Sequence, residues 1–306
     1  MKREGVLVIG SVNMDMVIST ERFPFQGETL LGTNFEMFPG GKGANQAVSC
    51  AKLGCRTFFI GKMGNDEFQK KLSDKMIEDG INLDHLYIDE KESTGIAFIT
   101  VDKAGQNEII VISGSNMKLT PGDIKNKESI FAGVKVILSQ LEIPLESVIE
   151  AGKIAKKNGN TFILNPAPAR ELPDELLQLV DFTTPNESEL ELLTGIEIKD
   201  EQTARDGAKA LLKRGVKNVV VTLGEVGALF VNGTTSTMFP ANKVRVVDTT
   251  GAGDAFNGAF AYYISEGYEI NKVIKAANIV ASLSVMKMGA QSSMPGKEDL
   301  PADIIS

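Results

Sequence analysis

The sequence has few of the residues that metal sites and nucleophilic sites commonly use. Its 306 residues include one histidine, His85, and two cysteines, Cys50 and Cys55. His85 has no ligand partners nearby in the sequence, which disfavours histidine-based catalysis and zinc sites. Both cysteines lie in an apolar stretch expected to be helical, where residues five apart do not share a face. We therefore expect two small core residues, not a disulfide or a metal site, in a protein of the reducing cytoplasm.

Long apolar runs and excess positive charge are also missing. No apolar run is long enough to span a bilayer, and the short one near the N-terminus lacks signal-peptide architecture. The formal net charge of −8 argues against a nucleic-acid surface. It does not argue against a bound nucleotide, which needs only local hydrogen-bond donors. Because no internal repeat or linker is evident, residues 1–306 are predicted to form one domain.

Strand and helix patterns alternate along most of the chain. Gly5–Gly10 is a continuous apolar run typical of a buried strand. No G-x-G-x-x-G turn follows it, which disfavours a dinucleotide fold of the usual kind. Further strands are predicted at 57–61, 134–139, 161–165, 181–184, 218–224 and 244–247, and helices at 43–53, 66–78, 145–157 and from 254 onward. This alternation predicts an α/β fold with a doubly wound, mainly parallel sheet flanked by helices.

Two hairpin-like pieces, near residues 12–38 and 93–112, interrupt that alternation. In the second piece, β-rich segments at 95–101 and 108–112 are joined by a turn at 102–106. We expect the two pieces to form one small antiparallel sheet that projects from the main body. Such a sheet cannot bury both faces alone, so it should serve as a lid, as a dimer surface or as both. A homodimer through this sheet would cover the apolar side chains of its outer face, Leu30, Leu31, Phe98 and Ile110.

The stretch Val247–Phe260, VDTTGAGDAFNGAF, joins a glycine turn to the start of a helix. Gly251, Ala252 and Gly253 let the backbone bend tightly and let a ligand come close. Free N–H groups and the helix dipole make such a start an anion site, with phosphate as the usual occupant. A carboxylate at this point would repel a phosphate, so Asp254 needs a reason to be there. One reason is general-base work, in which Asp254 takes a proton from an alcohol that attacks the phosphorus. The alternative is that Asp254 is a helix N-cap and the glycines are only a turn.

A second glycine-rich stretch, Pro39–Ala47, leads into an apolar helix and carries Lys42 between its glycines. It is not a Walker A loop, because no Ser or Thr follows the lysine and the spacing differs. By itself it indicates only a backbone that comes close to a ligand.

Several polar residues directly follow predicted strands, and ligands of parallel α/β sheets bind at the carboxyl ends of the strands. Asn13 and Asp15 share one face of an extended segment, so they could hold a polyhydroxy ligand or could be turn residues. The residues that follow strands are Asn13, Glu142, Asn186, Thr222 and Asp254.

With both glycine stretches, the chain resembles the ribokinase-like carbohydrate kinase family over essentially its whole length. One family signature is matched by Gly40–Ala47 with Gly54 and Gly64, the other by Asp248–Asp254 with Asn257, Gly258 and Ala259. The likeness is greatest to family members that phosphorylate ribose, through GGKGANQA and the segments 140–142, 165–170 and 289–291. The resemblance implies the family's α/β fold with a small β lid. It also implies ATP-dependent phosphorylation of D-ribose at its 5-hydroxyl.

The resemblance also implies a role for each motif residue. Asp254 would be the general base, and the amides of Gly251, Ala252 and Gly253 would hold the phosphoryl group as charge shifts. The sugar hydroxyls would be held by Asn13, Asp15, Gly41, Lys42, Asn45, Glu142 and Asp254. The nucleotide pocket would be lined by Asn186, Thr222, Gly224, Gly227, Gly253 and Asn278.

Two metal sites are implied in the same way. Asn186 and Glu189 would orient Mg²⁺ through water, since that ion sheds water reluctantly. The alternative for this pair is a helix cap followed by a first-turn acid. An activating K⁺ would be bound by a set in which several members use backbone carbonyls: Asp248, Thr250, Ser284, Lys287, Gly289 and Ser293. For Lys287 only the carbonyl could serve, because its ammonium would repel a cation, and the alternative for Asp248 is a turn aspartate.

Two rival functions stay open at this point. One is a sibling kinase that acts on another sugar or on a nucleoside, which would need an apolar pocket for the base. The other is a catalytically silent sugar-binding or regulatory protein on the same fold. The presence of Asp254 beside the turn Gly251–Gly253 argues against the silent protein, because a binder has no use for a base aimed at a phosphate.

Overall fold

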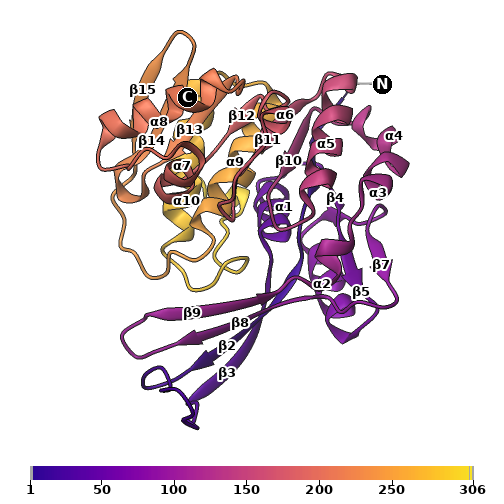
Figure 1. Cartoon of the computed structure of the whole chain (residues 1–306), viewed down its shortest axis with the longest axis vertical. Helices are drawn as coiled ribbons and strands as arrows, with labels where there is room; N and C mark the ends of the chain where they lie inside the picture. Colours follow the sequence, from indigo (N-terminus) through magenta and orange to yellow (C-terminus); the bar gives the residue numbers. More distant parts are fainter. Residues whose placement is uncertain (1–2, 303, 305–306) are drawn as a thin grey trace.

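The structure, a computed structural model, describes residues 3–302 and 304, and its centre is a nine-stranded sheet. The strands are β1 (Val6–Ile9), β4 (Thr57–Ile60), β6 (Ile81–Asn82), β10 (Val136–Ser139), β11 (Thr161–Leu164), β12 (Phe182–Thr183), β13 (Asn218–Thr222), β14 (Gly227–Asn232) and β15 (Ser236–Pro240). Their order is β15-β14-β13-β12-β11-β10-β1-β4-β6. Figure 1 labels the strands β10 to β15 and β4 of this sheet. Neighbours from β6 to β13 are parallel, whereas β14 and β15 join antiparallel. The predicted doubly wound, mainly parallel sheet is confirmed.

Helices cover both faces of this sheet. One core contains side chains of α1 (Lys42–Lys52), α2 (Glu67–Glu78), α9 (Ala252–Glu266) and α10 (Ile270–Ser284). The other contains side chains of α3 (Pro121–Asn126), α4 (Glu128–Phe131), α5 (Leu145–Asn158), α6 (Asp174–Leu177), α7 (Glu187–Thr194) and α8 (Glu201–Lys213). In β1, Val6 and Val8 enter the first core and Leu7 and Ile9 the second, as the two-residue period of a strand requires. Burial on both faces explains why the strand reads as an unbroken apolar run.

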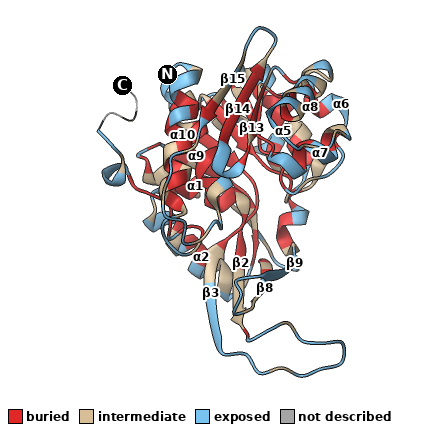
Figure 2. Ribbon diagram, turned by 90° about the vertical axis from the view of Figure 1, so that its left-hand side faces the viewer, coloured by how far each residue is buried: buried red, intermediate tan, exposed pale blue. Residues whose placement is uncertain are grey.

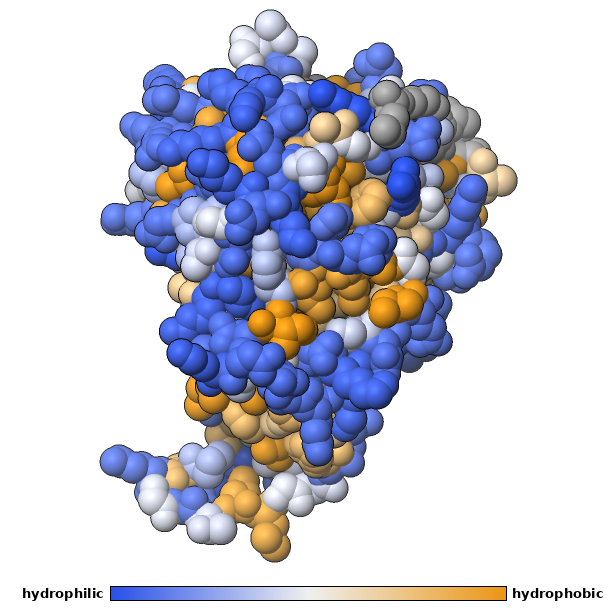
Figure 3. Space-filling model, turned by 90° about the vertical axis from the view of Figure 1, so that its right-hand side faces the viewer, coloured by the Kyte–Doolittle hydropathy of each residue, from blue (hydrophilic) through white to orange (hydrophobic). Residues whose placement is uncertain are grey.

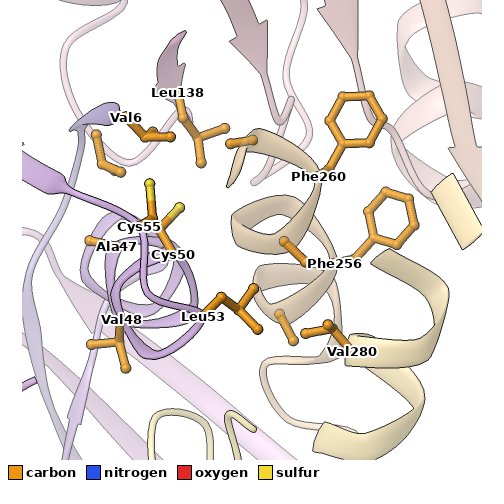
Figure 4. Close-up of a cluster of buried hydrophobic side chains, with 14 of the residues drawn as sticks. Val6, Ala47, Val48, Cys50, Leu53, Cys55, Leu138, Phe256, Phe260 and Val280 are labelled. Atoms are coloured by element: carbon orange, nitrogen blue, oxygen red, sulfur yellow. The ribbon is translucent and has the colours of Figure 1, made fainter. Parts of the chain in front are cut away.

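The first core joins α1 to α9, and it also contains both cysteines (Figure 4). Cys50 and Cys55 are free and buried, so the predicted core role is confirmed. The expectation that they occupy different faces of one helix is wrong, because α1 ends at Lys52 and the chain turns at Gly54, whose φ is +88°. That left-handed turn returns Cys55 to the same core.

The two hairpins form a separate four-stranded sheet, which we call the projecting sheet (Figure 1). Its strands are β2 (Asn13–Ser19), β3 (Asn34–Gly40), β8 (Gly95–Val101) and β9 (Asn107–Ile112), in the order β3-β2-β8-β9. Pairing is antiparallel within each hairpin but parallel between β2 and β8, so a wholly antiparallel sheet was the wrong expectation. Both inner strands leave the body side by side, from Asn13 and Gly95, and each hairpin returns along an outer strand. The main sheet is buried, whereas much of the projecting sheet is exposed (Figure 2).

In place of the strand predicted at 244–247, the structure has an irregular segment between β15 and α9. The backbone N–H groups of Val247 and Asp248 both donate to the carbonyl of Val285, just past α10, at 2.8 and 3.2 Å. The apolar pattern was misleading because Val246 and Val247 are 57% and 49% exposed and do not enter a core.

Short elements complete the architecture. They are the two-stranded pair β5 (Lys62–Gly64) and β7 (Tyr87–Asp89), and the 3-10 turns η1 (Gly114–Lys118), η2 (Gly224–Val226) and η3 (Lys297–Asp299). Within residues 3–302 and 304, every helix is too short or too polar to cross a membrane.

Candidate active site

A pocket of about 400 Å³ lies at the carboxyl ends of the central strands. Its wall combines residues that follow β11, β12 and β13 with the first turn of α9. Of the residues predicted from the sequence, the pocket brings together Lys42, Asn186, Glu189, Thr222, Gly224, Gly227, Gly251, Ala252, Gly253, Asp254 and Asn278. The proposed nucleotide and phosphoryl residues therefore share one cavity, as the rule for parallel sheets leads one to expect.

The remaining residues of the predicted sugar set lie where the projecting sheet leaves the body. Asn13 begins β2 opposite Gly40 of β3. A Cβ on Gly40 would lie 2.2 Å from Oδ2 of Asp15, so the Asp15 carboxylate occupies space that only glycine leaves open. Glu142 Oε2 accepts the backbone N–H of Lys42 at 3.0 Å. This group therefore adjoins the pocket through Lys42.

Asp254 is the third residue of α9 and not its cap. The helix begins after Gly251, whose φ is +77°, and the Asp254 carboxylate points to α1 instead of back to the turn. Its Oδ2 accepts the amide of Asn45 and its Oδ1 the amide of Gln46, each at 2.9 Å. The side chain is buried, with 7% exposed. These contacts contradict the N-cap alternative for Asp254.

The glycine turn in front of Asp254 is fixed by close packing. A Cβ on Gly251 would lie 3.1 Å from Cα of Ala290, and the positive φ also favours glycine. The side-chain amide of Asn257 donates to the carbonyl of Gly253 at 2.8 Å, and its oxygen accepts the Thr184 hydroxyl at 2.6 Å. The turn is thus tied to the end of β12, and the start of a 15-residue helix faces the pocket, with its dipole oriented to favour an anion there.

One ammonium faces several carboxylates in this site. Burial raises the pKa of Asp254, while Lys42 and the amides of Gln46 and Asn45 act to lower it. Burial would lower the pKa of Lys42, but Asp254, Glu142 and two further carboxylates raise it. Burial, followed by the charges of Glu142 and Asp254, raises the pKa of Asp15 to about 7. An uncharged polyol that donates hydroxyl hydrogens suits such a site.

The raised pKa of Asp15 predicts a pH-dependent cost in stability. Between its ordinary pKa of 3.8 and about 7, folded Asp15 keeps a proton that the unfolded chain has lost, so stability falls as pH rises through that window. We expect Asp15→Asn to raise the free energy of unfolding of the ligand-free protein at pH 8 by roughly 2 kcal/mol, after a discount for partial exposure. At pH 4 the difference should vanish. Urea unfolding at both pH values measures this, and an equal difference at both would contradict it.

Asn186 and Glu189 form the helix cap that was the alternative to a metal role. Asn186 Oδ1 accepts the N–H of Glu189 at 2.8 Å, and Glu189 Oε2 accepts the N–H of Asn186 at 2.9 Å. Both residues also line the pocket, and burial raises the pKa of Glu189. The cap uses one oxygen of Glu189, so the other carboxylate oxygen is compatible with a water shell of Mg²⁺.

Asp248 ties the segment before α9 to the segment after α10. Its Oδ1 accepts the N–H and hydroxyl of Thr250 at 2.9 and 2.7 Å, and its Oδ2 accepts the N–H of Gly289 at 2.8 Å. Burial acts to raise the pKa of Asp248, but these hydrogen bonds outweigh it and lower the pKa. The Lys287 ammonium lies 3.9 Å from Asp299, so it is directed to another carboxylate. The turn-aspartate geometry, which was the alternative to a cation ligand, is thus present.

The other members of the predicted cation set use their side chains locally. The Ser284 hydroxyl donates to the carbonyl of Ala281 at 2.8 Å, and the Ser293 hydroxyl to that of Ala290 at 2.9 Å. As donors, both hydroxyls keep their oxygen lone pairs, while the backbone carbonyl of Ser284 accepts the N–H of Lys287 at 3.4 Å.

Three glutamines and an asparagine that the sequence left without a role also belong to this site. Gln46, Gln140 and Gln291 form side-chain hydrogen bonds around Asp254, and Asn165 accepts from Gln46. All four lie inside the motif segments quoted for the family. Their place inside these motif segments was the only signal in the sequence that could have identified them. Hydrogen bonds between residues about 100 to 250 positions apart leave no local pattern in a sequence.

Comparison with known proteins places the chain among carbohydrate kinases. The family described as pfkB family carbohydrate kinase matches residues 3–297. A ribokinase from Haemophilus influenzae is 42% identical over 297 residues, which cover 97% of each chain. A bifunctional ribokinase/ribose-5-phosphate isomerase A from Fructilactobacillus sanfranciscensis is 44% identical over 295 residues; the match covers 96% of this chain but 55% of that protein. The solved structure of Arabidopsis thaliana ribokinase complexed with ribose and ATP has a TM-score of 0.91 at 35% identity, covering 97% of both chains.

Proposed function

Because the chain belongs to the pfkB family of carbohydrate kinases, we propose that it transfers the terminal phosphoryl group of ATP to O5 of D-ribose. The family predicted from the two glycine motifs is confirmed by this membership. The observation that carries the proposal is the buried carboxylate of Asp254. It lies beside the helix start that is proposed to bind an anion, and it points to the proposed sugar-binding residues of α1. Relatives named ribokinase, one of them complexed with ribose and ATP, support ribose and ATP as the substrates.

In this proposal the sugar lies between α1 and the base of the projecting sheet, which serves as its lid. Asp254 accepts the proton of O5 as that oxygen attacks the terminal phosphorus of ATP, and the bond from phosphorus to the bridging oxygen of ADP breaks. The N–H groups of the turn Gly251–Gly253 stabilise the charge on the transferred group. The sugar hydroxyls are held by Asn13, Asp15, Gly41, Lys42, Asn45 and Glu142.

The nucleotide occupies the 400 Å³ pocket, against Asn186, Thr222, Gly224, Gly227 and Asn278. The amide of Asn278 donates to the carbonyls of Phe239 and Pro240 at 3.1 and 3.4 Å, so that residue also supports the pocket wall. When bound, Mg²⁺ would neutralise phosphate charge, and Asn186 and Glu189 would orient it through water.

A panel of pentoses, 2-deoxyribose, hexoses and nucleosides, assayed by ADP release, tests the substrate. D-Ribose should give the highest kcat/KM. A higher kcat/KM for a nucleoside or another sugar would show that ribose is not the preferred substrate, but it would not contradict the kinase activity. Release of no ADP with any sugar, under conditions where ribose binds, would favour the catalytically silent binding protein.

We expect potassium to activate the enzyme when it replaces sodium or a bulky organic cation at fixed ionic strength. The cation would lie by Asp248 and the carbonyls of the segment 287–293, which packs on the glycine turn through Gly251 and Ala290. It would order that turn without touching substrate, so kcat should change more than the KM for ribose. The measurement is the initial rate in the three chloride salts. Equal initial rates in all three salts would contradict the proposed cation site.

A homodimer through the projecting sheet is proposed from its exposed apolar side chains, several of which are visible at the lower end of the molecule in Figure 3. Leu31 and Ile110 are 85% and 69% exposed, and Phe98 39%. Leu30 and Leu31 lie in the connection between β2 and β3 and not on a strand, which corrects their predicted placement. Such a patch favours a partner. Light scattering tests this proposal through the molar mass, which should be that of a dimer for the parent and that of a monomer for Ile110→Lys.

The cytoplasm is the compartment we propose for this protein. Cys50 and Cys55 are both free thiols buried in one core, an arrangement that a reducing compartment preserves. Fractionation of the cells that make the protein would test this.

A further inference from the structure

Both oxygens of the Asp254 carboxylate are held by neighbouring side chains of α1. Asn45 donates to Oδ2 and Gln46 to Oδ1, each at 2.9 Å. Gln46 is fully buried and Asn45 is 6% exposed. The amide nitrogen of Gln46 also donates to Asn165 Oδ1 at 2.9 Å. The general base of the proposed reaction is thus oriented by two primary amides that solvent hardly reaches.

The chemistry of a carboxylate fixes which way these amides face. An ionised carboxylate has no hydrogen to give, so Asn45 and Gln46 must turn their NH₂ groups toward Asp254 and their oxygens away from it. A 180° flip of either amide would have almost the same shape but would place oxygen against oxygen. A hydrogen-bond donor to the oxygen of each amide would favour the correct orientation.

Gln140 and Gln291 stand behind the two amides as donors. Gln140 Nε2 donates to Oε1 of Gln46 at 2.6 Å, and Gln291 Nε2 donates to Oδ1 of Asn45 at 3.0 Å. Both are buried, and among the described residues the Oε1 of each lacks a hydrogen-bond partner. A buried polar atom without a partner is costly. Each of these glutamines nevertheless keeps its N–H donation to the neighbouring amide, although its own side-chain oxygen stays unpaired within the described part of the chain.

We propose that Gln140 and Gln291 are positioning residues that lock the amides of Gln46 and Asn45 in the orientation that holds the Asp254 carboxylate ready to accept a proton. The inference rests on the proposed kinase reaction but assigns two residues that touch neither sugar nor nucleotide in it. The two glutamines belong to separate parts of the chain, because Gln140 follows β10 whereas Gln291 lies in the segment after α10.

The charges around Asp254 show why such orientation matters. Lys42 of α1 acts to lower the pKa of Asp254, whereas burial and Glu142 raise it. Asp15 of β2 and Glu189 of α7 are the further carboxylates whose charges interact with Asp254. With three acids and one ammonium near it, the base depends on its amide donors to stay ionised.

The test uses Gln140→Met and Gln291→Met, which keep the side-chain length but cannot donate. In each variant the oxygen of one amide loses its donor and is left buried without a partner, so that amide is free to shift away from Asp254. The value of kcat should then fall by about ten- to a hundredfold, as for a misplaced catalytic group, while the KM values for ribose and ATP change much less. The acid limb of the kcat–pH profile should move to higher pH, because the carboxylate loses a donor. The second variant tests the same idea on a separate segment if the first does not fold.

The matched control is Asn160→Leu, which removes another buried amide just before β11, at the ends of the strands opposite to the pocket, where Asn160 donates to the carbonyls of Phe131 and Val134. It should lower the melting temperature and leave kcat and the pH profile unchanged. The proposal is overturned if the control loses kcat as the glutamine variants do, or if those variants keep the parent kcat and acid limb.

An infrared titration separates this inference from the proposed function. The carbonyl band of protonated Asp254, identified by its absence in Asp254→Asn, should titrate at higher pH in both glutamine variants than in the parent. This holds whether or not any sugar is phosphorylated. A parent that binds ribose but turns over no substrate would overturn the kinase function, whereas an unmoved band would overturn the positioning role.

Discussion

Asp254→Asn should reduce kcat by about a hundred- to ten-thousand-fold while ribose and nucleotide still bind, because asparagine keeps the size of aspartate but cannot accept a proton. The amides of Asn45 and Gln46 would meet one amide nitrogen in the variant, so one of the two contacts would be lost. Loss of a buried charge offsets that cost, and the melting temperature should stay near that of the parent. The measurement is kcat with both dissociation constants and a melting curve.

Asp200→Asn is the matched control for this experiment. Asp200 caps α8 by accepting the N–H of Thr203 at 2.8 Å, and asparagine is as good a cap as aspartate. Both stability and turnover should therefore match those of the parent. If Asp254→Asn turned over within about threefold of the parent, far less than the loss of a general base costs, the proton would leave by another route.

Lys42→Met should lower kcat/KM by about a hundredfold or more, because it removes the cation among four carboxylates. Without that ammonium the pKa of Asp254 should rise further, so less of the base is ionised at neutral pH and the acid limb moves to higher pH. The folded protein should also lose stability at neutral pH and recover it at lower pH, as the carboxylates take up protons. Rates and urea unfolding measured between pH 5 and 9 check both effects.

Lys135→Met provides the matched control, since Lys135 is a half-buried lysine that donates to the carbonyl of Ser265 away from the pocket. Its pH profile should coincide with that of the parent. An unchanged profile in Lys42→Met as well would mean that Lys42 does not set the electrostatics of the site.

The sequence by itself determined the elements that carry the site. The apolar run 5–10 became a strand buried on both faces, and the predicted helix at 66–78 became α2 with Asp66 as its cap. The two glycine motifs became the starts of α1 and α9. These features are local, because hydrophobic periodicity, glycine turns and capping act over a few neighbouring residues. For the same reason the family could be identified before the fold was known.

Only the tertiary structure decided which residues meet Asp254 and how the hairpins pair. Asn45 and Gln46 lie more than 200 residues from Asp254 in the chain and reach it because α1 packs on α9. The parallel pairing of β2 with β8 follows from where both strands leave the body. The segment 244–247 shows the opposite case, an apolar pattern that formed no strand. Burial, side-chain partners and sheet neighbours depend on the packing of distant segments, and no local pattern encodes that packing.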